Sequence, residues 1–399
     1  MSTHSPARSH TSTLLALVLS VSLLWGCAPN QQQGTNQQTQ AAQDTQGAAT
    51  SQETATQVAT ADNVDLAATF PSWNPESASL GKLVAYVQDV TNKDSANYVE
   101  PTERLATFDM DGTLLCEKAP IYADYMLAIH RVLDDSTYTP EASDTELANK
   151  LLANANKGVV DTSLDNDKNQ MITRTFANMT PEDFRTYASN FFDTTNVMGF
   201  EGMTYAESYY RPMAEVVKYL QDNDFEVYVV SACEREVARV FASSKLNIDI
   251  DHVIGTDWNT KATGQGDEAV NQYTFAQQDK LVFDGTKTLE VAKLNKVVCI
   301  QREIGRRPLL AFGNNSGDYA MLNYAQSNPD HKGMGLLVLC DDVIREYGDT
   351  ERATSQKQEA DTEGWTTFSM ANDWAQIYGQ NVKKTQLPGD TQGDLAQAA

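Results

Sequence analysis

Two carboxylates stand where an apolar segment ends. In the stretch "LATFDMDGT" (105–113) the apolar, strand-like run ends at Asp109, and Asp111 follows two positions later. Side chains two positions apart at a strand end point the same way, and Gly112 permits a sharp turn beside them. The pair is suited to nucleophilic or acid–base chemistry, although "DMDG" would equally suit a turn with two solvated acids.

Further polar residues follow later apolar runs. Ser231 ends "EVYVVS", where its hydroxyl and the following amides can meet an anionic oxygen; capping of a helix over 234–244 is the competing interpretation. Asn314 and Asp318 lie four positions apart in "GNNSGD", so their oxygens suit a hard cation. Alternatively, Asp318 only stabilises the start of a helix. Lys296 precedes "VVCI", and a lysine alone indicates nothing.

The elements that must position these residues read as an α/β domain. Short apolar runs without alternation predict strands that are covered on both faces of a parallel sheet. They are 105–109, 226–231, 252–256, 309–313 and 335–340. Helical patterns follow over 212–224, 234–244 and 317–326. This alternation predicts a Rossmann-like, doubly wound parallel sheet. Ligands bind such sheets at the carboxyl ends of the strands, where Asp109, Ser231 and the 313–318 loop all fall.

A long insert, 117–211, separates the first two predicted strands and has helical patterns. "PIYADYMLAIHRVL" places aromatic and aliphatic residues at helical spacing. "TPEDFRTYASNFF" begins with Thr180 as a predicted N-cap and Pro181 at the first helical position. We interpret the aromatic residues as core packing rather than substrate contacts. An insert of this length is expected to lie above the strand ends as a cap.

The two ends of the chain have no pattern of a folded domain. Residues 1–27 indicate an export signal with a short apolar segment. Its end, "LLWGC", resembles a bacterial lipobox, which implies a lipid on Cys27 and a lipid-anchored protein on the extracytoplasmic face of the cell membrane. An ordinary secretory signal or an uncleaved anchor is the alternative. Residues 28–64, rich in Gln, Thr and Ala, predict a disordered tether, and 379–399 a disordered tail.

Charge and cysteine content restrict the partners. The formal net charge is −24, so nucleic acid is excluded as a partner, and contact with the membrane is expected through the N-terminal anchor only. An acidic enzyme that acts on anionic substrates needs local positive charge at its site. Cys299 and Cys340 lie in apolar runs and are expected in the core. Cys116 and Cys233 are interpreted as free thiols, with a disulfide as the alternative in an exported protein.

Taken in order, these motifs resemble the haloacid dehalogenase superfamily. The pattern is Asp-x-Asp-Gly-Thr, a strand followed by Ser, a lysine, and an acidic loop. Segments such as "YRPMAEVVKYLQDNDFEVYVVSA" and "IQREIGRRPLLAFGNNSGDYAML" resemble its phosphoserine-phosphatase-like, acid-phosphatase-type branch over most of 70–376. The resemblance implies a core of 65–116 and 212–378 and a helical C1-type cap of 117–211.

The resemblance also implies roles for individual residues. Asp109 would be the nucleophile and Asp111 the proton carrier. Phosphate binding would fall to Thr113, Ser231 and Lys296, and Mg²⁺ would be held by Asp109, the carbonyl of Asp111, Asn314 and Asp318. A cation and a lysine offset the repulsion between a carboxylate nucleophile and a phosphate. Lys296 is preferred over the nearby Lys293 because "NKVVCI" matches the branch's usual segment.

Within the superfamily, Asp111 favours a phosphatase. Members that release halide lack this second acid, because halide leaves without a proton, whereas a phosphate ester releases an alkoxide that needs one. Two positions depart from the family pattern. Asn314 stands where an aspartate is usual, and Ser316 where many relatives of this branch have an acid. Both remove negative charge from the expected metal site.

We therefore expect a Mg²⁺-dependent phosphomonoesterase that acts through a phospho-aspartate on a small phosphorylated substrate. The substrate range is phosphoserine-like, phosphorylcholine-like or that of a broad acid phosphatase. Tyr122 or Trp73 could pack on a choline group, although core packing is the stronger interpretation of each. The alternative is a non-catalytic surface lipoprotein that serves as a binding module. Phosphotransfer to an alcohol would use the same residues. The sequence sets no oligomeric state.

Overall fold

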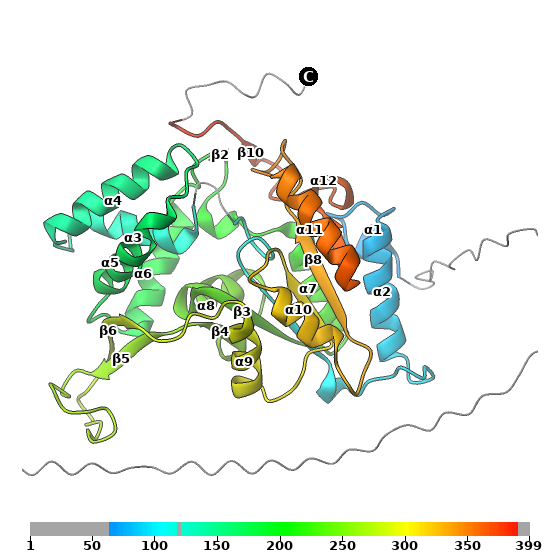
Figure 1. Ribbon diagram of the computed structural model, residues 1–399, viewed down its shortest axis with the longest axis horizontal. Helices are drawn as coiled ribbons and strands as arrows, with labels where there is room; N and C mark the ends of the chain where they lie inside the picture. Colours follow the sequence, from blue (N-terminus) through cyan, green and yellow to red (C-terminus); the bar gives the residue numbers. More distant parts are fainter. Residues whose placement is uncertain (1–63, 118–120, 390–399) are drawn as a thin grey trace, which may run out of the picture. The chain divides into compact units, whose positions relative to one another are not determined.

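A six-stranded parallel sheet organises the molecule, which the computed structural model describes over residues 64–117 and 121–389 (Figure 1). The order is β4-β3-β1-β7-β8-β9, and every neighbouring pair is parallel. The strands are β1 (Leu105–Phe108), β3 (Glu226–Glu234), β4 (Val253–Thr256), β7 (Leu310–Gly313), β8 (Met334–Leu339) and β9 (Thr366–Ser369). The predicted doubly wound α/β sheet is confirmed. The sixth strand, "TTFS", was not predicted because it is short and largely polar.

Both faces of the sheet are covered, which explains the unbroken apolar runs. Neighbouring residues of β3 enter different cores: Val229 belongs to one cluster and Val230 to the other. Buried residues of α2 (Ala78–Thr91), α7 (Arg211–Asp222) and α8 (Arg235–Lys245) lie in the Val229 cluster. Buried residues of α9 (Leu294–Glu303), α10 (Tyr319–Gln326) and α11 (Thr350–Glu363) lie in the Val230 cluster.

The strand order creates a switch point at β1. From β1 the chain first builds β3 and β4 on one side, and later β7, β8 and β9 on the other. The loops after β1, β3 and β7 therefore meet at one edge, where open α/β sheets bind their ligands. Short helical elements of the described chain are α1 (Leu66–Thr69), α12 (Met370–Asp373) and the 3₁₀ turns Pro101–Glu103, Thr162–Leu164, Tyr205–Glu207 and Ile250–His252. No helix in the described part of the chain is long and apolar enough to cross a membrane.

The insert after β1 is helical. Its four helices are α3 (Ala123–Leu133), α4 (Ala142–Ala155), α5 (Asp165–Thr175) and α6 (Pro181–Thr194). They gather beyond one end of the sheet in Figure 1. The start of α6 is as predicted, because the Thr180 side chain accepts a hydrogen bond from the Asp183 amide and Pro181 begins the helix.

A second insert, which the sequence did not indicate, follows β4. It is an antiparallel hairpin of β5 (Trp258–Ala262) and β6 (Leu281–Lys287). The ring centroid of Phe184 on α6 lies 5.3 Å from Trp258 and 5.6 Å from Phe283. Main-chain hydrogen bonds from Asn178 to Phe283 (2.9 Å) and from Phe283 to Met179 (3.0 Å) attach the hairpin to the helical insert. The two inserts thus share one small core.

The C-terminal part is ordered further than predicted. Residues 379–389 are described, and β10 (Lys383–Lys384) pairs antiparallel with β2 (Phe200–Glu201). Lys384 Nζ also donates to the carbonyls of Val343 and Glu346, each at 2.9 Å. The prediction of a disordered tail from 379 was therefore wrong for these residues, since pairing supplies contacts that local composition does not reveal. The predicted signal and nearly all of the tether lie outside the described residues.

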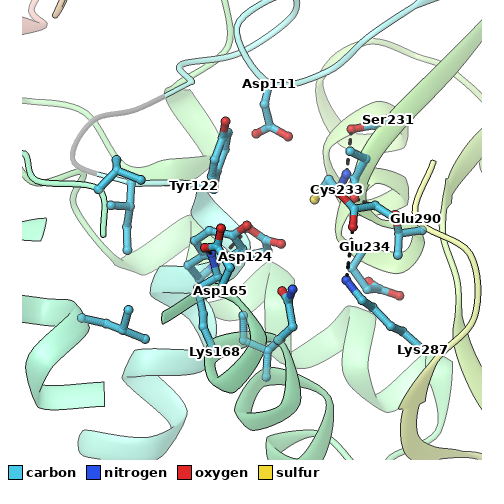
Figure 2. Close-up of a pocket in the computed structure, with 18 of the residues that line it drawn as sticks. Asp111, Tyr122, Asp124, Asp165, Lys168, Ser231, Cys233, Glu234, Lys287 and Glu290 are labelled. Atoms are coloured by element: carbon cyan, nitrogen blue, oxygen red, sulfur yellow. Dashed lines mark hydrogen bonds and ion pairs between the residues drawn. The ribbon is translucent and has the colours of Figure 1, made fainter. Parts of the chain in front are cut away.

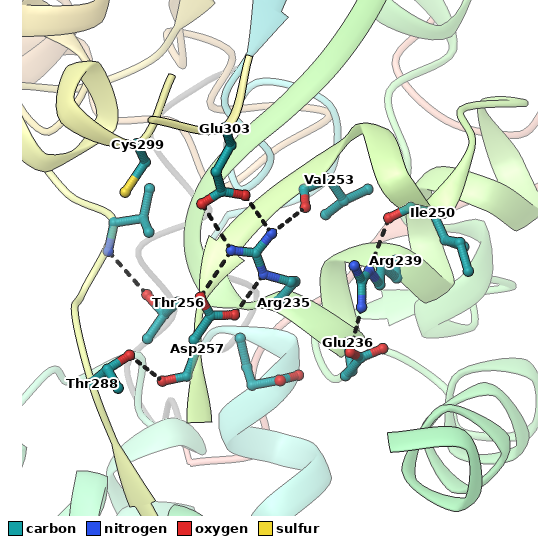
Figure 3. A network of polar contacts seen from close by, with 12 residues as sticks. Arg235, Glu236, Arg239, Ile250, Val253, Thr256, Asp257, Thr288, Cys299 and Glu303 are labelled. Atoms are coloured by element: carbon teal, nitrogen blue, oxygen red, sulfur yellow. Dashed lines mark hydrogen bonds and ion pairs between the residues drawn. The ribbon is translucent and has the colours of Figure 1, made fainter. Parts of the chain in front are cut away.

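A network of ion pairs around Arg235 lies at the start of the hairpin (Figure 3). Arg235, the first residue of α8, binds Asp257 through Nε (2.6 Å) and Nη2 (2.9 Å). The same guanidinium reaches Glu303 at the end of α9 (2.8 and 3.1 Å) and the carbonyl of Val253 (2.9 Å). Asp257 directly precedes β5, so this single side chain joins α8, α9 and the hairpin.

Replacing Arg235 by Gln is expected to lower the free energy of unfolding by about 1–3 kcal/mol, because Asp257 loses its charged partner, Glu303 keeps only Arg302, and the guanidinium that joins them is largely buried. Arg302→Gln is the matched control: Arg302 also binds Glu303 (2.7 Å), but half of its side chain is exposed, so a cost below about 1 kcal/mol is expected. Urea denaturation measures both. Equal losses would show that the bridging position of Arg235 is unimportant.

Candidate active site

Asp109 lies directly after β1 and is the centre of the site. Its side chain is buried, and both of its oxygens have partners. Lys296 Nζ donates to Oδ1 at 2.5 Å, and Thr113 Oγ1 donates to Oδ2 at 3.2 Å. Lys296 comes from α9, 187 positions along the chain. The structure thus brings together three of the predicted site residues, and it selects Lys296, not the exposed Lys293.

Two carboxylates share the Lys296 ammonium. Its Nζ lies 2.7 Å from Asp318 Oδ1 and also donates to the Val230 carbonyl at 2.6 Å. Burial lowers the pKa of Lys296, but Asp109 and Asp318 outweigh burial and raise it. Burial, followed by the charge of Asp318, raises the pKa of Asp109 to about 7, against the opposing effect of Lys296. One ammonium between two buried carboxylates leaves a negative charge without compensation.

The loop after β7 is held rigidly against the first motif. Asp318 Oδ2 accepts hydrogen bonds from the amides of Asn314 (2.9 Å) and Asn315 (3.1 Å). Gln356 of α11 donates to the Asn314 carbonyl at 2.6 Å. A Cβ on Gly112, whose φ is +84°, would lie 1.8 Å from Asn314 Nδ2. Only glycine therefore lets the turn after Asp111 come so close to the Asn314 amide.

Asp111 faces a cavity of about 520 Å³. Burial raises the pKa of Asp111 well above its ordinary value, and the nearby charges of Asp124, Asp109 and Glu117 raise it further. Its carboxyl is thus held in a different environment from that of Asp109, which contacts Lys296 directly. Such a difference between neighbouring acids suits separate roles in one reaction.

Ser231 is buried and lines the same cavity. Its Oγ accepts a hydrogen bond from the Cys233 amide at 3.1 Å, which leaves its own proton for another acceptor. The helix-capping interpretation of Ser231 was wrong, because Glu234 caps α8 by accepting from the Val237 amide at 2.8 Å. The register between β3 and β4 shifts between Val230 and Glu234, and this irregularity lies where the chain meets the cavity.

The cavity has walls from the helical insert, the end of β3 and the hairpin (Figure 2). Sequence reasoning did not single out most of these side chains, which include Asp124, Lys168, Glu234, Trp258, Lys287 and Glu290. Asp124 had a weak signal, since it is an acid at the start of a predicted helix that follows the first motif. The hairpin residues had none.

Two predictions about aromatic and sulfur residues are now resolved. Trp73 is 1% exposed and contributes to the core, where its Nε1 donates to the Pro212 carbonyl at 2.9 Å; only Tyr122 of the two proposed aromatics lines the cavity. Cys233 is a free thiol, so it forms no disulfide with Cys116. Cys116 Sγ instead lies 3.9 Å from Glu346 Oε1. Cys27 is outside the described residues.

A doubly wound parallel sheet with an acid pair after its first strand defines a hydrolase of the haloacid dehalogenase type. The family model of haloacid dehalogenase-like hydrolases matches residues 106–323, and the chain belongs to this family. None of the curated proteins compared with the chain matches it significantly.

Several solved structures are similar to the chain. A conserved protein of unknown function from Anaerococcus prevotii has 13% identity and a TM-score of 0.46, over 73% of this chain and 91% of that one. Cytosolic 5'-nucleotidase IIIB bound to cytidine has 13% identity and a TM-score of 0.40, over 67% and 80%. A phosphoserine phosphohydrolase-like protein from Francisella tularensis has 14% identity and a TM-score of 0.35, over 63% of this chain and 92% of that one.

Proposed function

We propose that the protein is a Mg²⁺-dependent phosphomonoesterase that acts through a phospho-aspartate. The observation that carries this proposal is the contact of Lys296 and Thr113 with the two oxygens of Asp109, beside a cavity that Asp111 and Ser231 line. A carboxylate next to a lysine ammonium and a hydroxyl, with a second hydroxyl on the same cavity, is suited to receive a phosphoryl group, because the oxygens of the carboxylate and of the phosphate can share these donors.

The reaction takes two steps. An oxygen of Asp109 forms a bond to phosphorus while the bond from phosphorus to the ester oxygen breaks, and Asp111 gives its proton to that leaving oxygen. A water oxygen then forms a bond to phosphorus while the bond from phosphorus to the Asp109 oxygen breaks, and Asp111 takes a proton from that water. Inorganic phosphate and the free Asp109 carboxylate result. The pair is well placed for this exchange, since Asp109 is buried against Lys296 and Asp111 faces the cavity through which the alcohol leaves.

The residues present fit a hard cation. In the described part of the chain no group of three or more His, Cys, Asp and Glu side chains is arranged to hold a metal. However, Asn314 Nδ2 is buried without a hydrogen-bond partner beside the Gly112 turn. Rotating the amide by 180° would place its oxygen there, in exchange for the hydrogen bond that Asn314 Oδ1 accepts from Asn315 Nδ2 at 2.8 Å. Carboxylates of Asp109 and Asp318, the Asn314 amide and the Asp111 carbonyl would hold Mg²⁺, which neutralises phosphoryl charge when bound.

Release of phosphate by the whole chain tests the proposal. With Mg²⁺, we expect steady hydrolysis of p-nitrophenyl phosphate and of small alkyl phosphates. EDTA should abolish it and added Mg²⁺ restore it, and the affinity for the metal is expected to be low because an amide replaces a carboxylate. Binding of phosphate without turnover, over a panel of esters and with metal present, would instead support the binding-module alternative.

A further inference from the structure

The cavity beside the proposed catalytic acids is strongly acidic. Seven carboxylates line it, against two lysines. The carboxylates belong to Asp109, Asp111, Asp124, Asp161, Asp165, Glu234 and Glu290, and the lysines are Lys168 and Lys287. A phosphate ester must nevertheless enter. The part of the substrate that fills the acidic region is therefore expected to be neutral or positively charged.

Both lysines of the cavity already have acidic partners. Lys168 Nζ lies 2.7 Å from Asp165 Oδ1, and Lys287 Nζ lies 3.4 Å from Glu290 Oε2. Neither is therefore a free cation for an anionic substrate group. This arrangement disfavours alcohols that carry a carboxylate or a second phosphate.

Besides Asp111, two carboxylates of the cavity have no cation of the described chain in direct contact, although the charges of Lys168 and Lys287 reach Asp124 from farther away. Among the described residues, which leave out 118–120, no lysine, arginine or histidine nitrogen lies within 4.0 Å of Asp124 or Glu234. Each carboxylate accepts one backbone hydrogen bond: Asp124 from the Tyr125 amide (2.9 Å) and Glu234 from the Val237 amide (2.8 Å). Those bonds explain why acids stand at helix starts. They do not supply a compensating positive charge.

The cavity contains its own example of cation recognition. The Lys168 ammonium lies 4.0 Å from the centroid of the Tyr125 ring while it pairs with Asp165. An aromatic face and a carboxylate thus hold one cation. The neighbouring Tyr122 ring, 5.3 Å from Tyr125, is drawn in Figure 2 between Asp111 and Asp124 and is contacted by no cation of the described chain.

We propose that the enzyme prefers phosphomonoesters of an alcohol that carries a cationic nitrogen. Asp124 of α3 and Glu234 at the end of β3 are the recognising carboxylates, and Tyr122, drawn between Asp111 and Asp124, is the aromatic surface. This preference rests on the phosphatase activity proposed above. The cation would lie on the leaving-group side of the cavity, beyond Asp111, where it offsets carboxylates that otherwise repel an anionic ester.

The electrostatics of the two acids agree with this assignment. Burial raises the pKa of Asp124 to about 6 and that of Glu234 to about 8. The protein therefore stabilises their ionised forms poorly, and a bound cation would stabilise them.

Two esters of the same shape, one with a cationic and one with a neutral alcohol group, test the preference. Trimethylammonioethyl phosphate and 3,3-dimethylbutyl phosphate differ only in a charged nitrogen against a neutral carbon, and phosphoglycolate supplies an anionic alcohol. We expect kcat/KM for the cationic ester to exceed that for the neutral one by about tenfold or more, and phosphoglycolate to be slowest. A ratio near one, or fastest hydrolysis of phosphoglycolate, would overturn the preference but leave the phosphatase proposal intact. Hydrolysis of none would refute the phosphatase proposal itself.

Substitutions then assign the preference to the two acids. Asp124→Asn and Glu234→Gln should each lower the cationic-to-neutral ratio about fivefold or more, and both retain an oxygen for the backbone hydrogen bond. Glu146→Gln is the control, because Glu146 is an exposed acid on α4 outside the cavity, and the ratio should not change. An unchanged ratio in both test variants would contradict the assignment. If a variant fails to fold, inhibition of the wild-type enzyme by the trimethylammonio alcohol, compared with 3,3-dimethylbutanol, remains decisive.

Discussion

Asp109→Asn is expected to lower kcat for every phosphomonoester by about 10⁴-fold or more, as removal of a covalent nucleophile commonly does. An amide oxygen is a far weaker nucleophile than a carboxylate, and among the described residues no other acid that lines the cavity contacts Lys296. Acid-quenched reactions should show a phosphoryl group bound to the wild-type chain and none on the variant. Asp330→Asn, an exposed acid of the same charge, should retain activity.

The same substitution should leave the fold intact. Asp109 and Asp318 share one ammonium, so an amide in place of the Asp109 carboxylate removes the uncompensated charge while the contact between Lys296 and Asp318 remains. We expect a melting temperature equal to or higher than that of the wild-type chain, measured in EDTA. A large loss of stability together with lost activity would indicate that Asp109 is a structural residue.

Asp111→Asn is expected to have an effect that depends on the leaving group. For alkyl phosphates, whose alkoxide needs a proton, kcat should fall by about 10²–10⁴-fold. For p-nitrophenyl phosphate, whose leaving group is stable as an anion, formation of the phospho-aspartate should be nearly unaffected. Hydrolysis of the phospho-aspartate should still be slow, because Asp111 is also the base that takes a proton from the attacking water. The variant should therefore release a burst of nitrophenolate and accumulate phosphorylated chain.

Stopped-flow absorbance and acid quenching measure these two steps separately. Asp161→Asn is a suitable control, because Asp161 also lines the cavity but its Oδ1 is engaged by Ser163 at 2.5 Å. It should show no burst. Equal losses in the rate of phospho-aspartate formation from alkyl and nitrophenyl esters in Asp111→Asn would contradict the role of Asp111 as the proton carrier.

Much of the fold could be predicted because burial on both faces leaves a local signal. Strands such as 105–108 and 310–313 are entirely buried, so they appear as unbroken apolar runs. The N-cap of α6 was equally local, since Thr180 and Pro181 act within one turn. The hairpin after β4 left no such signal. Its segment 258–287 is mostly polar, and its stability comes from contacts with Phe184 and the main chain around Asn178.

The sequence by itself determined the family, the acid pair after β1 and the direction in which the strand ends must meet, because these depend on short motifs and on strand–helix alternation. The export signal and the lipid on Cys27 remain predictions. Only the tertiary structure decided that Lys296 joins Asp109 and Asp318, that Glu234 and not Ser231 caps α8, and that Asp124 faces the same cavity. The physical reason is that charge compensation and cavity walls are made by residues distant in the chain, and local sequence carries no record of such pairs.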